Sequence, residues 1–276
     1  MRIRAVTWNL LNGGIDDPSE ARFRKQATIL RDLGPDLLAL QECRWWDAEG
    51  ERRLLWMASF LHMTPVIMQR SHLGDGTNHT ALLYNPSRLA LIDRQTLGVR
   101  AFHHALIRAR LRPVGSSNPN DDLLALATHL SWVDGDTRLS EARWTTDYAG
   151  PFPGMPGNAI YMGDLNCPHP DDTPDWSQVP QNLHSRYRYV LPDGAFGDAD
   201  MRALQVLLKS GWVHPEVHTG KPRDATVGYF YENEPVPLRL DHILVHGLSP
   251  ISYFTHDTGA ARGASDHLPV VLDTEV

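Results

Sequence analysis

Eight short apolar runs, rich in β-branched or aromatic residues and spread along the whole chain, constrain the fold most strongly. Runs of this length and composition are typical of buried β-strands. Helical periodicity appears between some of them, at 19–33, 47–62, 136–148 and 200–210, without strict alternation of strand and helix. This order favours a mixed layered fold over a doubly wound parallel sheet. The predicted strands are 3–8, 36–41, 79–85, 104–111, 122–130, 158–163, 238–246 and 268–272.

The size and polarity of the chain are those of a globular protein with a large core. It has 276 residues, 42% of them hydrophobic, and no apolar run approaches the ~18 residues of a membrane span. We expect a single domain, 1–276, with surface loops at the Pro- and Gly-rich stretches 113–120, 150–157 and 168–197. The start, MRIRAVTWNL, is too short an apolar stretch for a signal peptide, so we expect a cytoplasmic protein.

The charge balance bears on the binding partner. Lys and Arg number 26 and Asp and Glu 33, which gives a net charge of −7, and the basic residues form no long run. A protein that holds duplex DNA by counterion release usually presents a basic face, so the balance favours a phosphorylated small molecule over nucleic acid. Nucleic acid stays possible, because a local patch and a bound metal ion both supply positive charge. Cys43 and Cys167 are too few for a disulfide framework and are expected as reduced, half-buried thiols.

Polar side chains stand where most of the predicted strands end. If the strands gather in packed sheets, their ends converge at one rim, where ligand sites commonly form. Asp164 and Asn166 are two positions apart and should project to the same face, and Gly163 permits a close approach of backbone or ligand. Asp266 and His267 are adjacent, so both serve one site only if they lie on the turn before the last strand. The strand-end residues are Asn9, Glu42, His129, Asp164, Asn166, Asp266 and His267.

Six short motifs, TWN, QE, TH, GDLN, LDHI and SDH, follow one another in this order from Asn9 to His267. In order and separation they closely resemble the endonuclease/exonuclease/phosphatase superfamily, which has the deoxyribonuclease-I-like fold. The resemblance implies an α+β protein built as a four-layer α/β/β/α sandwich, with two mixed sheets packed face to face and helices outside. It also implies one divalent metal ion, Mg²⁺ or Mn²⁺, and hydrolysis of phosphate esters.

The oxygen-bearing residues of these motifs suit a hard metal ion. Magnesium prefers oxygen ligands and often takes only one or two carboxylates from the protein. Glu42 is the best candidate for the main metal ligand, and Asn9 is expected to help through its amide oxygen and to contact the substrate. Asp266 is a further candidate for the metal shell.

The resemblance also assigns roles in the hydrolysis itself. It implies that Asp164 orients and deprotonates the attacking water and that Asn166 contacts the phosphate. His267 matches the histidine that contacts the scissile phosphate, and Asp241 matches its carboxylate partner. Such a partner raises the pKa of a histidine, so His267 is expected to act as an electrophile or acid rather than as a base. His129 would be a second contact to the phosphate or the leaving group.

Each of these residues alone has a more ordinary interpretation, as a turn former, a solvated strand end or a core histidine. The joint pattern favours the functional one. Asp171 and Asp172 are expected in solvated or capping roles rather than at a second metal site. The remaining histidines show no HExxH zinc motif and are expected mostly on the surface or in loops; they include His62, His72, His79, His103, His104 and His169.

Substrate specificity in such a fold depends on loops rather than on the catalytic strands. The candidates are 70–79, 98–104, 132–137 and above all 167–197, which contains the run RYRY. Arg186, Tyr187 and Arg188 of this run would stack a base while holding a phosphate. The alternative is an amphipathic edge strand with alternating faces.

Three functions are compatible with the sequence. The favoured one is a metal-dependent phosphoesterase acting on a small or medium phosphorylated molecule: a nucleotide, a sugar phosphate or a lipid headgroup. The second is a DNA or RNA nuclease or an enzyme that processes nucleic-acid ends. The third is a binding module that has the fold without turnover, and it is the least favoured because no catalytic position is replaced. The oligomeric state is left open.

Overall fold

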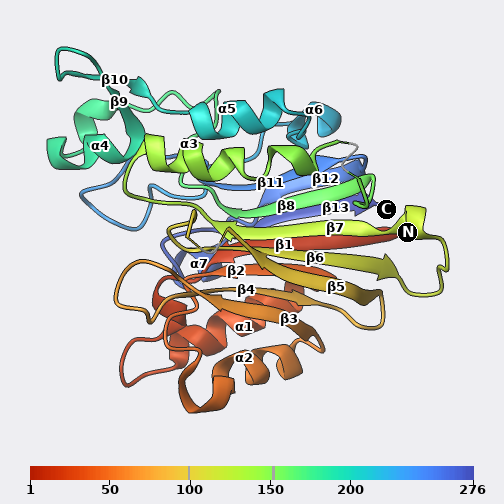
Figure 1. Cartoon of the computed structure of the whole chain (residues 1–276). Coiled ribbons are helices and arrows are strands. Elements are labelled where there is room, and N and C mark those ends of the chain that lie inside the picture. Colours follow the sequence, from red (N-terminus) through yellow and green to blue (C-terminus); the bar gives the residue numbers. More distant parts are fainter. Residues whose placement is uncertain (99, 151–152) are drawn as a thin grey trace.

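Two β-sheets lie face to face at the centre of the molecule (Figure 1). The computed structural model describes residues 1–98, 100–150 and 153–276. The first sheet has the order β12 (Ser249–Thr255), β13 (Val270–Glu275), β1 (Arg2–Asn9), β2 (Leu37–Gln41), β4 (His79–Tyr84), β3 (Thr64–Arg70). The second has the order β11 (Asp241–His246), β8 (Asn158–Asp164), β7 (Leu123–His129), β6 (Ala105–Pro113), β5 (Leu89–Leu97). A separate hairpin pairs β9 (Arg188–Val190) with β10 (Phe196–Ala199).

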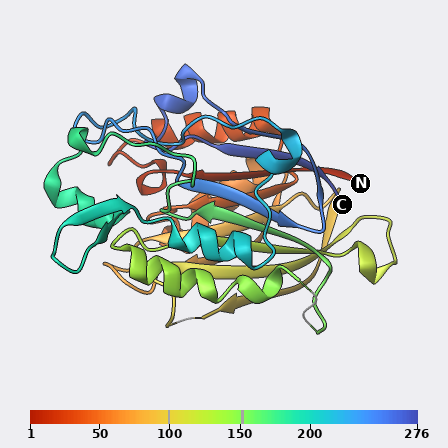
Figure 2. The same ribbon diagram turned by 90° about the horizontal axis from the view of Figure 1, so that it is seen from above.

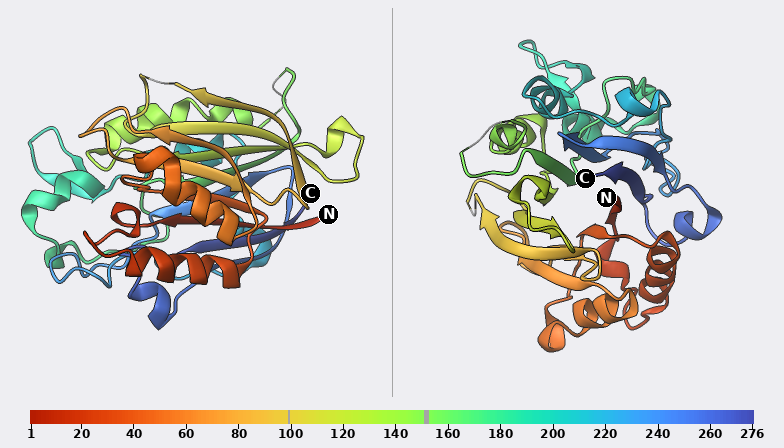
Figure 3. Two further views of the ribbon diagram at one scale, coloured as in Figure 1. Left: turned by 90° about the horizontal axis from the view of Figure 1, so that it is seen from below. Right: turned by 90° about the vertical axis from the view of Figure 1, so that its right-hand side faces the viewer.

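Helices cover the outer face of each sheet, as Figures 2 and 3 show from further sides. Helices α1 (Ala21–Leu33) and α2 (Ala48–Phe60) lie on the first sheet, and α3 (Gly135–Arg143) and α5 (Arg202–Lys209) on the second. None of the helices among the described residues is long and apolar enough to cross a membrane. The shorter helices are α4 (His184–Tyr187), α6 (Glu216–Thr219) and α7 (Gly259–Arg262), with 3-10 turns at Asn12–Gly14, Pro119–Asp121, Thr146–Tyr148, Trp176–Gln178 and Gln181–Leu183.

The hydrophobic residues form three buried layers, because side chains along each strand alternate between its two faces. On β1, Ile3 lies in the core between the sheets, whereas Trp8 packs beneath α1 and α2. On β8, Ile160 lies between the sheets and Tyr161 packs beneath α3 and α5. Three apolar layers separate four layers of structure, so the predicted α/β/β/α sandwich is confirmed.

The strands that the sequence did not predict are β3, β5 and β12 in the sheets and both strands of the hairpin. In the sheets these strands lie at the edges, where one side is solvated and no continuous apolar run is needed. The prediction that 168–197 is a surface loop is also wrong. This segment contains two 3-10 turns, α4, β9 and the start of β10. The expected segments 150–157 and 98–104 include residues 151–152 and 99, which lie outside the described residues. Cys43 and Cys167 are free as expected, but both are fully buried rather than half-buried.

Asp273 fastens the three strands β1, β13 and β12 through its carboxylate. Arg4 Nε donates to Oδ1 at 2.8 Å, and Arg2 and Ser252 donate to Oδ2 at 2.9 Å each. The hydrogen bond from Arg4 lowers the pKa of Asp273 to about 2, against the opposing effect of burial. A depressed folded-state pKa gives stability that is fully present above the unfolded pKa of ~3.9 and is lost as the pH falls toward 2.

Asp273→Asn should therefore lower the free energy of unfolding at pH 7 by on the order of 1–2 kcal/mol. The difference from wild type should shrink as the pH falls from about 4 through about 2, because Asp273 becomes protonated and then carries a neutral side chain like the variant's. Urea denaturation across this pH range measures both effects. Asp32→Asn, at an exposed position whose partner is the adjacent Arg31, is the control and should change stability little. A pH-independent loss would contradict the charge-based explanation.

Candidate active site

The polar strand ends of the two sheets meet at one rim. His129 ends β7 and Asp164 ends the parallel strand β8, and the two residues are partners in the pairing register. Asp241 begins β11, which runs antiparallel to β8, so it is also the register partner of Asp164. From the first sheet, Asn9 ends β1 and Glu42 follows β2, which is parallel to β1. The predicted convergence of these residues therefore results directly from strand direction.

Asn9 connects the two halves of this rim. Its Nδ2 donates to Glu42 Oε1 at 3.2 Å and to Asp164 Oδ2 at 3.0 Å. The amide oxygen, expected at a metal, accepts the Leu11 backbone N–H at 3.1 Å and keeps one lone pair for another partner. Glu42 Oε2 accepts the Asn12 backbone N–H at 2.9 Å. Hydrogen bonds thus hold the carboxylates of both sheets in place.

Glu42 and Asp266 are two carboxylates whose negative charges repel each other. Burial and then the negative charge of Asp266 raise the pKa of Glu42 above its ordinary value. Asp266 and His267 lie on the turn that precedes β13, as the sequence required if both were to serve one site. The donor set of two carboxylates and the Asn9 amide oxygen consists of hard oxygens, which suits Mg²⁺ or Mn²⁺, and a dication would offset the repulsion. The residues therefore fit the expected metal.

His267, Asp241 and Asp164 form a compact acid–base cluster. The Nδ1–H of His267 donates to Asp241 Oδ2 at 2.8 Å, and its Nε2 lies 3.8 Å from Asp164 Oδ2. Burial disfavours the imidazolium, but the charges of Asp241 and then Asp164 outweigh it, so the pKa of His267 is raised well above its ordinary value. Burial and then the charge of Asp241 raise the pKa of Asp164 to about 7. The three residues also bring donor atoms within 4.8 Å of one another, close enough to share a cation.

His129 belongs to a stack of histidines that the sequence did not predict. Its Nε2 lies 3.4 Å from Asp164 Oδ2, and its ring stacks on His104 with centroids 3.9 Å apart. His104 stacks in turn on His103 at 4.8 Å and shares a 2.8 Å hydrogen bond with Ser71 Oγ. Burial and then the neighbouring His103 lower the pKa of His104 to about 3, and burial and His104 lower that of His129. The stack is therefore uncharged at neutral pH.

Most of the other twelve histidines lie on the surface or in loops, as expected, but five of them are buried. The buried ones are His79, His104, His169, His214 and His242. A histidine can be buried when it remains neutral, which depends on tertiary neighbours that no local pattern indicates. The adjacent pair at 103–104 was the one visible sign of the stack.

Asn166 lies at the site but not in the strand. It follows β8 with φ 48°, in the left-handed region, and its backbone N–H donates to Asp164 Oδ1 at 2.8 Å. Its Nδ2 donates to the Leu130 carbonyl at 3.0 Å. Asn166 therefore orients Asp164 through its backbone while its side chain faces a pocket. Gly163 allows close backbone approach, as predicted, because a Cβ there would lie 2.0 Å from the Thr128 carbonyl oxygen.

One pocket adjoins the acid–base cluster at His267, and a second lies at Glu42 and His129 of the same rim. The first has a volume of about 70 Å³ and is rich in aromatic residues, with Asn166, Asp266 and His267 at its polar end. The second has a volume of about 390 Å³ and lies on the side of Glu42 and His129. The aromatic residues of the first pocket are Trp176, Tyr187, Phe230 and Tyr231; the second is also lined by Asn12, Arg44, His103 and Trp132.

The residues of the run RYRY are divided between α4 and the hairpin strand β9. Arg186 and Tyr187 end α4, and Arg188 begins β9, so the run is not one edge strand. Tyr187 lines the first pocket. Arg186 lies 3.4 Å from Glu234 of the first pocket, and its guanidinium lies 5.0 Å from the ring centroid of Trp132 in the second. Arg188 donates to the carbonyls of its own hairpin, and its guanidinium lies 5.5 Å from the ring centroid of Trp176 in the first pocket.

Tyr231 is a site residue that the sequence did not indicate. It lines the first pocket, and burial and then the charge of Asp266 raise its pKa. The aromatic run YFY at 229–231 was the available signal, but it lies outside every predicted strand and motif. The hydroxyl is therefore neutral at physiological pH and suited to donate a hydrogen bond beside the carboxylates.

The two-sheet sandwich and the histidine–carboxylate rim define the class of phosphoester-hydrolysing α/β/β/α proteins. Within that class, the chain belongs to the endonuclease/exonuclease/phosphatase family, whose model matches residues 6–267. A comparison with curated proteins finds no match.

Among solved structures, a mannosyl-6-phosphatase from Bacteroides thetaiotaomicron is 14% identical with a TM-score of 0.67, over 99% of this chain and 100% of that one. ANGEL2, a 2',3'-cyclic phosphatase in complex with adenosine-2',3'-vanadate, is 14% identical with a TM-score of 0.66, over 99% and 95%. Humanized D. rerio TDP2 is 14% identical with a TM-score of 0.60, over 100% and 99%. At these identities the likeness shows the shared fold.

Proposed function

We propose that this protein is a divalent-metal-dependent hydrolase that cleaves a phosphate ester of a small or medium-sized molecule. The observation that carries the proposal is the cluster in which His267 bridges Asp241 and Asp164 beside the carboxylates Glu42 and Asp266. Phosphate-ester hydrolysis needs an oriented water, positive charge at the phosphoryl oxygens and help for the leaving oxygen. The cluster offers a group for each requirement. A cytoplasmic location stays a prediction from the N-terminal sequence.

Each residue then has a definite task. Asp164, whose pKa is raised to about 7, accepts the proton of the attacking water. His267, held as the imidazolium by Asp241, donates Nε2–H to a phosphoryl or leaving oxygen. Glu42 and Asp266, with the remaining lone pair of Asn9, would hold Mg²⁺ or Mn²⁺, which when bound supplies charge neutralisation of the phosphate. The amides of Asn166 and Asn9 and the neutral His129 complete the polar surface toward the phosphate.

The aromatic pocket favours a nucleotide among the small substrates. Trp176, Tyr187 and Phe230 line a space that begins at His267, so a base would stack there with its phosphate at the acid–base cluster. Arg186, between the two pockets, is placed to add charge for a second phosphate. ANGEL2, of similar fold, binds adenosine-2',3'-vanadate, whereas the mannosyl-6-phosphatase acts on a sugar phosphate, so both classes belong in the test.

A nuclease is the second candidate. The second pocket is bordered by cation–aromatic pairs, with Arg44 4.6 Å from the ring centroid of Trp45 and Arg186 5.0 Å from that of Trp132. Such pairs are suited to single-stranded nucleic acid. The net charge of −7 disfavours long duplexes. A non-catalytic binding module is the third and least supported candidate.

Product identification by mass spectrometry distinguishes these functions. Wild-type protein and Asp164→Asn are incubated with Mg²⁺, Mn²⁺ or EDTA and one mixed set of nucleotides, sugar phosphates, phospholipid headgroup esters and short DNA and RNA strands. We expect metal-dependent loss of a nucleotide or another small phosphoester by wild type alone. Salt-sensitive cleavage of the oligonucleotides would establish the nuclease instead. Metal binding without hydrolysis of any compound would favour the binding module and overturn the proposal.

Glu42→Gln tests the assignment of the metal ligand. The change keeps the shape of the side chain but removes the charge, so the half-saturating Mg²⁺ concentration should rise by on the order of tenfold or more, with a smaller effect on turnover at saturating metal. Magnesium titration of the initial rate measures it. Glu51→Gln, exposed on α2, is the matched control and should leave the metal dependence unchanged. An unchanged titration in Glu42→Gln would remove it as the main ligand.

A further inference from the structure

Two buried charged residues of α3 bind the backbone of three segments at the edge of the active site. Arg138 and Glu141 are three positions apart, so they lie on the same side of the helix, and both are fully buried. Their hydrogen bonds go to backbone groups of residues that are distant in sequence. These are His103 in the predicted specificity segment 98–104, Ser131 immediately before 132–137, and Arg186 in 167–197.

Glu141 binds two backbone N–H groups with one carboxylate. Its Oε1 accepts the N–H of His103 at 2.6 Å, and its Oε2 accepts the N–H of Ser131 at 2.7 Å. Ser131 Oγ and His103 Nδ1 share a further hydrogen bond of 3.1 Å, which joins the two loops directly. Burial raises the pKa of Glu141 to about 7, and the two N–H groups and then the charge of Arg138 oppose this shift. At pH 8 the side chain is therefore mainly a carboxylate that uses both oxygens as acceptors.

Arg138 makes the complementary contacts to backbone carbonyls. Its Nη1 donates to the Ser131 carbonyl at 3.3 Å, and its Nη2 donates to the Arg186 carbonyl at 2.5 Å. The guanidinium reaches two carbonyls at once because its donors form a rigid planar fork, which the single ammonium of a lysine does not reproduce. Ser131 is thus held at its N–H by Glu141 and at its carbonyl by Arg138.

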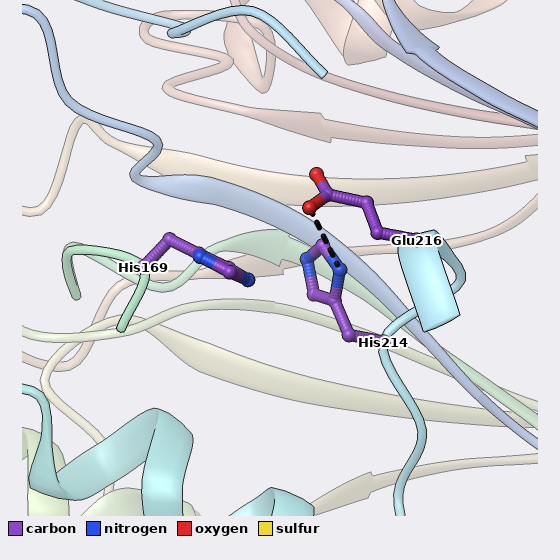
Figure 4. Close-up of side chains that lie close together, drawn as sticks. All are labelled: His169, His214 and Glu216. Atoms are coloured by element: carbon purple, nitrogen blue, oxygen red, sulfur yellow. Dashed lines mark ion pairs between the residues drawn. The ribbon is translucent and has the colours of Figure 1, made fainter. Parts of the chain in front are cut away.

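A buried arginine beside α6 shows the more usual way to bury such a charge. Figure 4 shows Glu216 beside the ring of His214, and Arg239 Nη1 lies 3.2 Å from Glu216 Oε2. Arg239 also donates from Nε to Asp172 Oδ1 at 2.6 Å, so two carboxylates neutralise it. Arg138 instead donates to the carbonyls of two loops. Its contacts therefore fix the positions of those loops.

The same loops carry the side chains that lie between the two pockets. His103 and Trp132 line the second pocket, and Tyr187, next to Arg186, lines the first. The guanidinium of Arg186 lies 5.0 Å from the ring centroid of Trp132, and the His103 ring lies 6.3 Å from it. Trp132 is 46% exposed, so the position of its ring depends on how the backbone at Ser131 is held. A cation–aromatic contact forms only within ~6 Å of the ring, so the pair requires both loops to be fixed.

The acid–base cluster is held in place without α3. Asp164 and Asp241 are register partners in β8 and β11, and His267 lies on the turn before β13. His129 ends β7, where the ladders to β6 and β8 fix its backbone. The bonds from α3 therefore position groups around the substrate rather than the reacting groups.

We propose that Arg138 and Glu141 are positioning residues for substrate specificity, which fix the loops that contact the part of the substrate beyond the scissile phosphate. The inference deepens the proposed hydrolysis, on which its kinetic consequence rests. To that part of the substrate Arg186 offers positive charge and Trp132 a stacking surface. Loss of the bonds from α3 should weaken binding of the whole substrate and leave the chemical step nearly intact.

Glu141→Gln and Arg138→Lys test the proposal, because one is nearly isosteric and the other keeps the charge. The glutamine replaces one acceptor by a donor that faces the N–H of His103 or Ser131, and the lysine does not bridge two carbonyls. Steady-state kinetics at pH 8 and saturating Mg²⁺ use the phosphoester that the product analysis identifies. KM should rise at least about fivefold while kcat stays within about threefold of wild type. Arg143→Gln, exposed at the end of α3, is the matched control and should equal wild type.

Inorganic phosphate distinguishes a positioning role from a general structural defect. As a competitive inhibitor it occupies the acid–base cluster and does not reach the loops, so its inhibition constant should stay within about twofold of wild type in both variants. General loosening of the site would weaken the binding of phosphate and of substrate together. Circular dichroism and Tm check that the variants are folded, and Glu141→Gln, the milder change, decides the question if Arg138→Lys does not fold.

Hydrogen–deuterium exchange of the free protein measures the hold on the loops without any substrate. Glu141→Gln should speed exchange at the amides of His103 and Ser131 at least about threefold, because the variant no longer accepts both N–H groups. Arg138→Lys should do the same in 184–188. Exchange in β8 should stay as in wild type, and Arg143→Gln should change none of these segments.

Four results would overturn the proposal. They are an unchanged KM in both variants, a fall in kcat with KM unchanged, a phosphate inhibition constant that rises in parallel with KM, and unchanged exchange at His103 and Ser131 in Glu141→Gln. Absence of hydrolysis by wild type would be a failure of the proposed function instead. The exchange measurement then still decides whether Arg138 and Glu141 hold the loops, because it uses neither substrate nor turnover.

Discussion

Asp164→Asn should lower turnover by at least about 10²-fold while the protein stays folded. The amide is nearly isosteric with the carboxylate, and Asn9 Nδ2, which donates to Oδ2 at 3.0 Å, can donate equally to an amide oxygen. What the variant lacks is a base at the point where His129 and His267 both approach Oδ2, at 3.4 and 3.8 Å. The attacking water then has no group to take its proton.

Steady-state kinetics at saturating Mg²⁺ measure this loss on whichever phosphoester the product analysis identifies. Asp198→Asn, at an exposed position of β10, is the matched control and should keep wild-type turnover. Circular dichroism and Tm of the two variants separate a catalytic defect from an unfolded protein. Full activity in a folded Asp164→Asn would show that another group activates the water.

His267→Gln and Asp241→Asn should each lower turnover by about 10²–10³-fold, and the double variant should be little worse than His267→Gln alone. Asp241 has one purpose in this arrangement, which is to hold His267 through the 2.8 Å bond and to keep it protonated. Its other oxygen, Oδ1, is buried and without a hydrogen-bond partner in the part of the chain that the structure describes. Once the histidine is gone, the carboxylate has nothing left to orient.

A double-mutant cycle of these variants measures the coupling between the two residues. His256→Gln, between β12 and α7, is the control histidine and should be close to wild type. The pH dependence of kcat/KM adds a second readout, because loss of Asp241 removes a charge that raises the pKa of His267. Losses that multiply independently would show that Asp241 acts on the reaction by a route other than His267.

The convergence of polar side chains at one rim was predictable from the sequence because it depends on strand ends, and strand ends are visible as the points where apolar runs stop. Asn9, Glu42, His129 and Asp164 were placed this way, and the family motifs added Asp241, which no strand end marks. The apolar runs indicated a mixed layered fold, and the four-layer architecture was what the family resemblance implied. The rim and the layered fold could both be predicted because each depends on short patterns that are local in the sequence.

The features that escaped prediction depend on neighbours that are distant in sequence. His104 stacks on His129 because β6 and β7 pair side by side, and His169 meets His214 because a segment after β8 lies against α6. Edge strands such as β5 were missed because a solvated side removes the apolar signal. The substrate role of Arg188 stays a prediction, and the bonds of its guanidinium to the carbonyls of its own hairpin were not visible in the sequence.

The hydrogen bond between Asn9 and Asp164 has a consequence for how the protein loses activity. It joins a residue of the first sheet to one of the second, and the bond between His267 and Asp241 joins the same two sheets again. Catalytic activity therefore depends on the relative position of the two sheets. A displacement of one sheet relative to the other by a fraction of a hydrogen-bond length would abolish activity, while the backbone hydrogen bonds within each sheet remained intact. Inactivation should accordingly come earlier on heating than the loss of secondary structure.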